Sequence, residues 1–138
     1  MSRAMITHAK EYATAMLIPE LLPTFQAYLW RRYGVHPDNV VFKVDEARQR
    51  ILDATFLSYG ENERRIYEGD VPINGETDGE AIWIDRDLTF ESMVITLIHE
   101  ALHDSVFILR TTRSSTMRGL STEDEHAIMS ILGVDETD

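Results

Sequence analysis

Three residues of the chain carry the spacing of a metal-binding motif: His99, Glu100 and His103 form the pattern His-Glu-x-x-His. On a helix, positions i and i+4 lie on one face, so both imidazoles can reach the same metal ion. Glu100 lies about 100° further round the helix than His99, where its carboxylate can hold and deprotonate a metal-bound water. The chemistry that this spacing indicates is metal-assisted hydrolysis.

The segment around the motif is apolar on nearly every side, which predicts a buried helix. The apolar neighbours of the motif are Ile95, Leu97, Ile98, Ala101 and Leu102. Two imidazoles and a carboxylate are costly in such a setting unless something satisfies them, and a Zn²⁺ ion bound to the histidines would do so. The alternative is an ordinary core helix whose two polar histidines lie at its edge.

Length and composition indicate one globular domain, residues 1–138. Of the 138 residues, 43% are hydrophobic and 27% are charged, which is ordinary for a globular protein. The chain has no cysteine, so it has neither a disulfide framework nor a thiolate zinc site. Any zinc ion must therefore be held by histidine, aspartate or glutamate side chains.

Charge and hydropathy disfavour two classes of partner. The formal net charge is −11 at pH 7, whereas binding to the nucleic-acid backbone needs clustered Lys and Arg. No apolar run approaches the roughly 18 residues of a transmembrane helix, and residues 1–10 lack the apolar core of a signal peptide. We therefore expect a cytoplasmic protein without contact to nucleic acid or membrane, with secretion by a route other than a signal peptide as the alternative.

Two helices are expected at the N-terminus. Residues 4–17 are rich in alanine and predict a first helix. Pro19 and Pro23 separate it from a second helix over residues 23–33, because proline breaks a helix or begins one. Gly34 is well placed to end the second helix.

Strands are expected in the middle of the chain. Residues 40–44 and 51–59 are rich in β-formers and predict a hairpin, with residues 45–48 as its connection. Residues 61–79 are polar and contain several glycines, which predicts a loop, with a short strand near residues 65–67 as an option within it. Residues 81–85 (Ala-Ile-Trp-Ile-Asp) predict a short strand whose side chains alternate between two faces.

The motif itself is expected on a helix over residues 90–109. Thr89 or Asp87 can cap its N-terminus. Trp30 and Trp83, the two tryptophans of the chain, are expected in the hydrophobic core.

A last helix is expected to begin at Ser121 or Thr122 and to end at Gly133. Thr122 and Glu125 have the spacing of a capping box, in which each side chain bonds the backbone of the other residue. Helices, then strands, then helices along the chain indicate an α+β fold.

The C-terminal half of the chain resembles a minimal zincin metallopeptidase of the gluzincin type. The resemblance is carried by the strand at 82–85, the motif His99-Glu100-x-x-His103 and the helix at 122–132. It implies a zincin-like fold with N-terminal helices, a small twisted and mostly antiparallel sheet, an active-site helix and a short ligand helix. It also implies Zn²⁺ as the cofactor, Glu100 as the catalytic base, and a peptide substrate along the free edge of that strand.

The resemblance implies a third metal ligand on the last helix, where this chain departs from the family pattern. Gluzincins supply a glutamate there, often with a second acid four residues later, but the row Glu-Asp-Glu-His at 123–126 lacks that second acid. Family ligands precede two apolar, two variable and two more apolar residues, and His126 fits that spacing. The alternatives for the third ligand are Glu125, which also belongs to the expected capping box, and Glu123, which lies close to the helix start. A further alternative is that His126 is a solvated residue on the polar face of the helix.

Two functions are compatible with these residues. The first is a zinc-dependent metallopeptidase that hydrolyses peptide bonds with a metal-activated water. The second is a zincin-fold binding or regulatory module with little or no protease activity, because a small domain leaves little wall for a substrate cleft. An acidic surface of this kind could face a basic protein partner.

Overall fold

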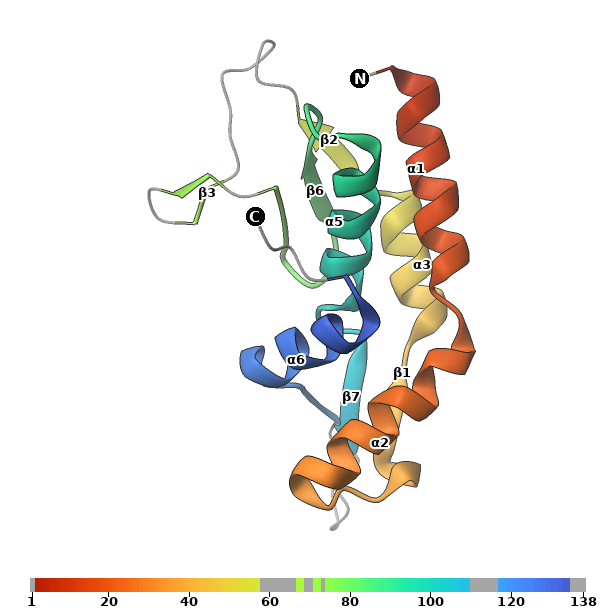
Figure 1. Ribbon diagram of the computed structural model, residues 1–138, viewed down its shortest axis with the longest axis vertical. Coiled ribbons are helices and arrows are strands. Elements are labelled where there is room, and N and C mark those ends of the chain that lie inside the picture. Colours follow the sequence, from red (N-terminus) through yellow and green to blue (C-terminus); the bar gives the residue numbers. More distant parts are fainter. Residues whose placement is uncertain (1, 58–66, 69–70, 73, 110–116, 135–138) are drawn as a thin grey trace.

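The structure, a computed structural model, describes residues 2–57, 67–68, 71–72, 74–109 and 117–134. Within these residues the chain is an α+β protein, and the α+β class expected from the sequence is confirmed (Figure 1). The pairs of described strands are mostly antiparallel, as expected, with β2–β6 as the parallel exception. However, these strands form three small sheets instead of one.

Two helices open the chain. Helix α1 (Arg3–Met16) is followed by a 3₁₀ turn, Pro19–Leu21, and by helix α2 (Leu22–Tyr33). Gly34 ends α2 with φ 67°, a left-handed conformation that glycine adopts without steric cost. A second 3₁₀ turn, Pro37–Asn39, leads out of this region. Both predicted helices are confirmed.

The hairpin predicted for residues 40–59 is wrong. Strand β1 (Val40–Phe42) leads into helix α3 (Val44–Leu52), which takes the place of the expected turn and of the start of the second strand. Ala47 and Ile51 lie four residues apart and are both fully buried, as the helical period requires. Burial on the helical period therefore outweighs the β-propensity of the segment.

Strand β6 (Ile82–Asp85) is the central strand of a three-stranded sheet. Strand β2 (Thr55–Leu57) pairs with it in parallel, and β5 (Gly75–Thr77) pairs antiparallel with its other edge. The free edge expected on residues 81–85 for a substrate is therefore wrong, because both edges of this strand are hydrogen-bonded.

The segment expected to be a loop, residues 61–79, contains further strands. Besides β5, it holds β3 (Tyr67–Glu68) and β4 (Val71–Pro72), which pair antiparallel with each other. The remaining residues of this segment before 74 lie outside the described part of the chain. The short strand that the sequence suggests near residues 65–67 overlaps β3 at Tyr67, while residues 65 and 66 lie outside the described part of the chain. Strands β4 and β5 are too short for an alternating pattern, so the sequence did not predict them.

Helix α5 (Phe90–Leu102) runs between α1 and the β6 sheet (Figure 1). Thr89 caps it, because the Oγ1 of Thr89 accepts a hydrogen bond from the backbone N–H of Ser92. Helices α1 and α3 and strands β5 and β6 all pack against α5. Its buried residues are Met93, Val94, Thr96, Leu97, Ile98, Glu100, Ala101 and Leu102. The burial predicted from its apolar composition is confirmed.

Helix α5 ends earlier than the sequence predicts. The last helical residue is Leu102, and two residues later Asp104 takes φ 60°. Ser105 donates hydrogen bonds from its backbone N–H and its Oγ to the carbonyl of Leu102, which turns the chain out of the helix. The apolar run that follows is strand β7 (Val106–Leu109), which pairs antiparallel with β1 and with β8 (Met117–Gly119).

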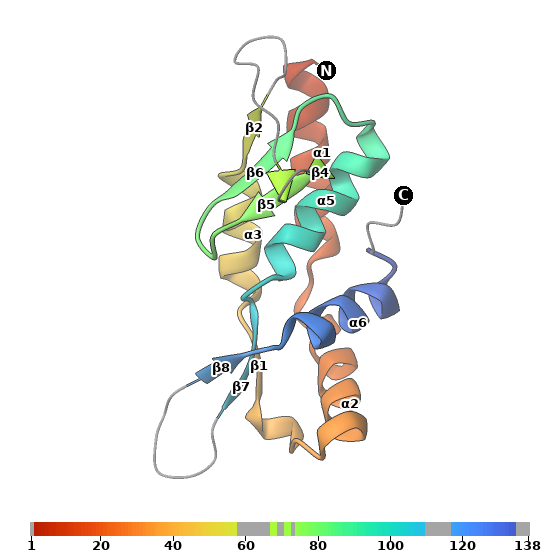
Figure 2. The same cartoon turned by 90° about the vertical axis from the view of Figure 1, so that its left-hand side faces the viewer.

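Helix α6 (Thr122–Leu132) crosses the molecule between α5 and α2 (Figures 1 and 2). Ser121 caps it, since the Oγ of Ser121 accepts a hydrogen bond from the backbone N–H of Asp124. Gly133 ends it with φ 75°. The capping box expected one residue later is wrong, which leaves the side chain of Glu125 to another role.

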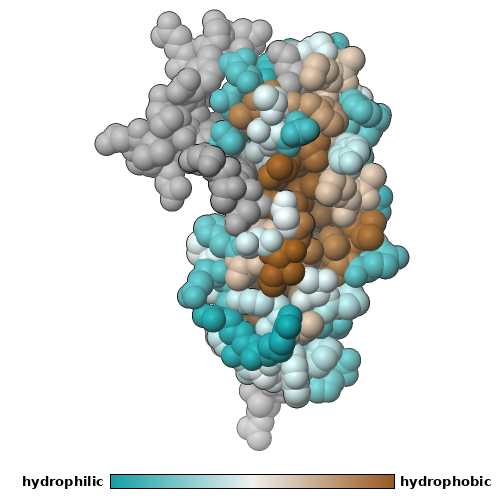
Figure 3. Space-filling model, in the orientation of Figure 1, coloured by the Kyte–Doolittle hydropathy of each residue, from teal (hydrophilic) through white to brown (hydrophobic). Residues whose placement is uncertain are grey.

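Apolar side chains also reach the surface. Figure 3 shows hydrophobic surface along the middle of one face, over α5 and the neighbouring α1. Trp30 of α2 is 55% exposed, so its expected place in the core is wrong, while Trp83 of β6 is half-buried. No helix among the described residues has both the length and the apolar character needed to cross a membrane.

Replacing Gly75 in β5 by alanine should lower the free energy of unfolding by about 1–3 kcal/mol, because it overpacks the core. A Cβ there would lie 2.7 Å from Cγ2 of Thr96 and 2.9 Å from Cδ1 of Ile84, both fully buried. Gly119→Ala is the control, since its Cβ would meet Asp104 at an ordinary 3.9 Å. Urea unfolding measures both variants. A Gly75→Ala protein as stable as the parent would contradict close packing of β5 on α5.

Candidate metal centre

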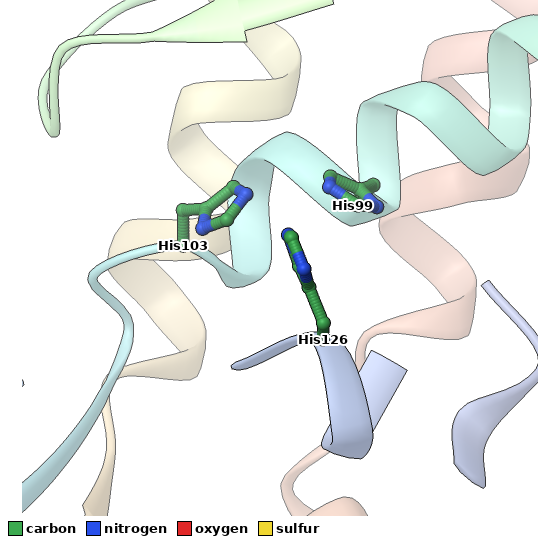
Figure 4. Close-up of side chains that lie close together, drawn as sticks. All are labelled: His99, His103 and His126. Carbon is green, nitrogen blue, oxygen red and sulfur yellow. The ribbon is translucent and has the colours of Figure 1, made fainter. Parts of the chain in front are cut away.

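Three histidines from the C-terminal end of α5 and from α6 lie together (Figure 4). His99 lies in the last turn of α5, His103 directly follows that helix, and His126 lies in the first half of α6. One possible ligand atom of each lies within 4.8 Å of the others. The three side chains could therefore hold a single metal ion. Among the candidates for a third ligand, His126 is the one that the structure brings to His99 and His103.

His103 stays beside His99 although the helix ends one residue earlier. The centroids of the two imidazole rings lie 5.0 Å apart. The backbone carbonyl of His103 accepts a hydrogen bond from Nη1 of Arg50 in α3, at 3.2 Å. Arg50 also places a positive charge at the C-terminal end of α5, where the helix dipole favours it. Helix α3, which was not predicted from the sequence, thus holds the end of α5 that carries the second histidine.

Glu125 points toward the histidines and not toward the helix cap. Its Oε2 lies 2.7 Å from Nδ1 of His103, and Glu125 is only 9% exposed. Because the cap belongs to Ser121, the role that the sequence assigned to Glu125 is replaced by a hydrogen bond across the α5–α6 contact.

The carboxylates around His103 control its protonation. Burial by itself lowers the pKa of His103. The hydrogen bond to Glu125 and its negative charge, with further contributions from Glu100 and Asp104, outweigh burial and raise that pKa above its usual value. The neighbourhood of the histidine cluster is therefore negative, which also favours a bound cation.

Glu100, the middle residue of the motif, is a buried acid next to His99. Only 6% of Glu100 is exposed, although it carries a carboxyl group. Its charge acts on His103, as described above, so the carboxylate lies within electrostatic range of the cluster.

Asp124 fastens α6 to α2. Its carboxylate accepts hydrogen bonds from the hydroxyl groups of Tyr28 and Tyr33, at 2.7 and 2.6 Å. Ser121 donates a third hydrogen bond at 2.8 Å, and Nε of Arg32 lies 3.1 Å away. Asp124 is 3% exposed, so these partners satisfy a buried charge. This network was not predicted. Its one signal in the sequence is the cap spacing Ser121-x-x-Asp124.

The same network shifts two pKa values. Burial, together with the hydrogen bond to Asp124, raises the pKa of Tyr28 to about 12. Burial alone would raise the pKa of Asp124, but the hydrogen bonds from Tyr33, Tyr28 and Ser121 outweigh it and lower that pKa below its usual value. The folded protein therefore favours the ionised carboxylate.

An Asp124→Asn substitution should lower the free energy of unfolding by about 1–3 kcal/mol at pH 7, because the hydroxyl donors lose a charged acceptor. A depressed folded-state pKa stabilises the protein above the unfolded-state value, and this contribution is lost as the pH falls through the folded-state value. The gap between parent and variant should therefore shrink on acidification below about pH 4. Urea unfolding across this range measures it, with the exposed Asp38→Asn as control. A gap that stays constant with pH would contradict the network.

Comparison with known proteins gives no relative for this chain: no protein-family model, no curated protein and no solved structure matches it. What the chain does is therefore argued from the three histidines, Glu100 and Glu125, and from the helices that hold them.

Proposed function

We propose that this chain is a zinc-dependent metallopeptidase with a zincin-like fold. The observation that carries the proposal is the convergence of His99, His103 and His126 from the end of α5 and from α6, with the buried Glu100 nearby. Three protein ligands and an open fourth position are typical of catalytic zinc sites, whereas structural sites are closed by four.

The donor set fits zinc. Imidazole nitrogen is a preferred zinc ligand, and Zn–N bonds of about 2.0–2.1 Å in a tetrahedron place two nitrogens about 3.3 Å apart. The ligand atoms here all lie within 4.8 Å of one another, so small rotations of the three side chains would close the set around an ion. Neutral imidazoles bind the metal, and the nearby acids offset its charge.

The reaction that we propose is hydrolysis of a peptide bond. A bound zinc ion supplies Lewis acidity, which acidifies water and polarises a carbonyl group. Glu100 accepts the proton of the attacking water and delivers it to the leaving amine. His99, His103 and His126 hold the ion and do not exchange protons with the substrate.

Strand β5 offers a place for an extended substrate. It pairs with β6 along one edge, and among the described strands none pairs with its other edge. Strand β5 also packs against α5, the helix that carries His99 and Glu100. A peptide that adds to this edge would gain main-chain hydrogen bonds and lie beside the histidines.

The proposal is tested on protein purified without a histidine tag. Zinc content is measured by elemental analysis, and cleavage of an unfolded protein is followed before and after chelation and after zinc is restored. We expect about one zinc per chain and activity that follows the metal. Tight zinc binding without cleavage would favour the binding-module function, and absence of zinc binding would reject the metal centre.

Substitution of His126 by alanine should weaken zinc binding by more than about tenfold, because it removes one of three protein ligands. Glu123→Ala is the matched control on the same helix, since its side chain is 77% exposed and lies against Arg32. Competition with a chelator of known affinity measures both variants. If Glu123→Ala released the metal and His126→Ala did not, the third ligand would be misassigned.

A further inference from the structure

Glu125 and His126 are consecutive residues of α6, and both lie against the end of α5. His126 joins the histidine cluster, whereas Oε2 of Glu125 is hydrogen-bonded to Nδ1 of His103 at 2.7 Å. We propose that Glu125 is a positioning residue, whose carboxylate keeps the imidazole proton of His103 on Nδ1 and thereby presents Nε2 to the metal ion. This inference rests on the proposed function.

Metal binding by His103 requires a choice between the two ring nitrogens of its imidazole. A neutral imidazole carries its proton on one ring nitrogen and can coordinate a metal only through the other. A carboxylate accepts hydrogen bonds and donates none, so a carboxylate 2.7 Å from Nδ1 selects the form that is protonated there. In Figure 4, the ring nitrogen of His103 that is farther from the backbone is turned toward His99. That nitrogen is Nε2, on the side where the cluster lies.

The position of Glu125 separates this role from that of a ligand. Its carboxylate is committed to Nδ1 of His103, on the side of the ring that is turned away from His99. Glu125 is 9% exposed, so water competes weakly for the hydrogen bond. Glu123, two residues earlier, has a side chain that is 77% exposed and pairs with Arg32. The two glutamates of this helix therefore have different surroundings and can be compared directly.

Loss of the carboxylate should loosen the metal site without removing a ligand. The imidazole of His103 would then populate both neutral forms and rotate more freely, so zinc binding would have to select one arrangement. Substitution of a hydrogen-bond partner of a metal ligand typically weakens metal binding by about 10- to 100-fold. Glutamine keeps an acceptor oxygen but no charge, so Glu125→Gln should fall between the parent and Glu125→Ala.

The test combines two measurements on the full chain. Zinc affinity is measured by chelator competition, and the tautomer of His103 is read from the ¹⁵N shifts of its ring in the zinc-loaded protein. The variants are Glu125→Ala, Glu125→Gln and, as control, Glu123→Gln, with circular dichroism to confirm folding. We expect Nδ1–H in the parent, weaker binding and a changed Nδ1 signal in Glu125→Ala, a smaller change in Glu125→Gln, and no change in Glu123→Gln.

The outcomes separate this inference from the function on which it rests. A parent protein that binds no zinc would overturn both. If the parent binds zinc and Glu125→Ala binds it equally well with the same ¹⁵N shifts, Glu125 does not position His103, and the metal centre stands. If Glu125→Ala loses zinc as completely as His99→Ala does, Glu125 is a ligand and the positioning role is wrong.

Discussion

A His99→Ala variant should contain no zinc above background after dialysis against metal-free buffer, whereas the parent should retain about one ion per chain. The reason is that ligand atoms of His99 at the end of α5, of His103 directly after it and of His126 in α6 lie within 4.8 Å of one another, so a single ion would need all three. Removal of His99 leaves two protein ligands, which is fewer than zinc sites in proteins use. We expect the same loss for His103→Ala.

Elemental analysis measures this loss, and thermal unfolding provides a second readout. A ligand that binds only the folded state stabilises it, by about 2.7 kcal/mol at a concentration one hundred times its Kd. Added zinc should therefore raise the Tm of the parent and leave that of His99→Ala unchanged. His36→Ala is the control, because the side chain of His36 is 63% exposed and lies outside the cluster. Stoichiometric zinc in His99→Ala would reject this metal centre.

A Glu100→Gln variant should keep its zinc and its fold but lose hydrolysis by a factor of about 10² to 10⁴, the usual contribution of a general base. Glutamine has nearly the shape of glutamate but cannot accept the proton of water. Because Glu100 is only 6% exposed, a shape-conserving substitution is needed to leave the packing of α5 intact.

Initial rates of cleavage, normalised to bound zinc, measure the effect. Glu91→Gln makes the same change of charge on an exposed residue in the first turn of α5, so its rate should equal that of the parent. Turnover by Glu100→Gln at the rate of the parent would show that another group takes the proton. A variant that also loses zinc would indicate that Glu100 supports the metal site itself.

The helix ends that depend on neighbouring residues could be predicted from the sequence. Gly34 and Gly133 end their helices in the left-handed conformation, and Thr89 caps α5 with its side chain. These features follow from local chemistry: glycine tolerates positive φ, and a threonine hydroxyl can bond the free N–H groups of a first turn. The i, i+4 spacing of His99 and His103 is local in the same sense.

The features that depend on distant segments could not be predicted. The sequence predicts a hairpin around α3, because β-formers flank residues 45–48. The strand that pairs with β1 lies far along the chain, at Val106–Leu109. The end of α5 was missed for a related reason. An apolar run after Asp104 continues the helical pattern, and only the turn at Ser105 and the pairing of β7 convert it to a strand.

The candidate site likewise combines features that depend on neighbouring residues with features that depend on distant segments. The resemblance to gluzincins implies a third ligand on the last helix, and the residues after His126 match the family spacing; the structure places His126 beside His99 and His103. The partner of Glu125 could not be read from the sequence, because the choice of Ser121 as cap and the approach of α6 to α5 together decide it.

In the first half of α6, three consecutive residues each contact a different part of the protein: Asp124 faces α2, Glu125 faces His103, and His126 faces the histidine cluster. An α-helix turns by about 100° for each residue, so one inserted or deleted residue after Ser121 would rotate all three side chains away from their partners at once. This segment should therefore be far less tolerant of a change in length than of a change in exposed side chains. In protein engineering, the solvent-facing residues of α6 can be substituted, while the rotation of the helix about its own axis has to stay the same relative to the rest of the fold.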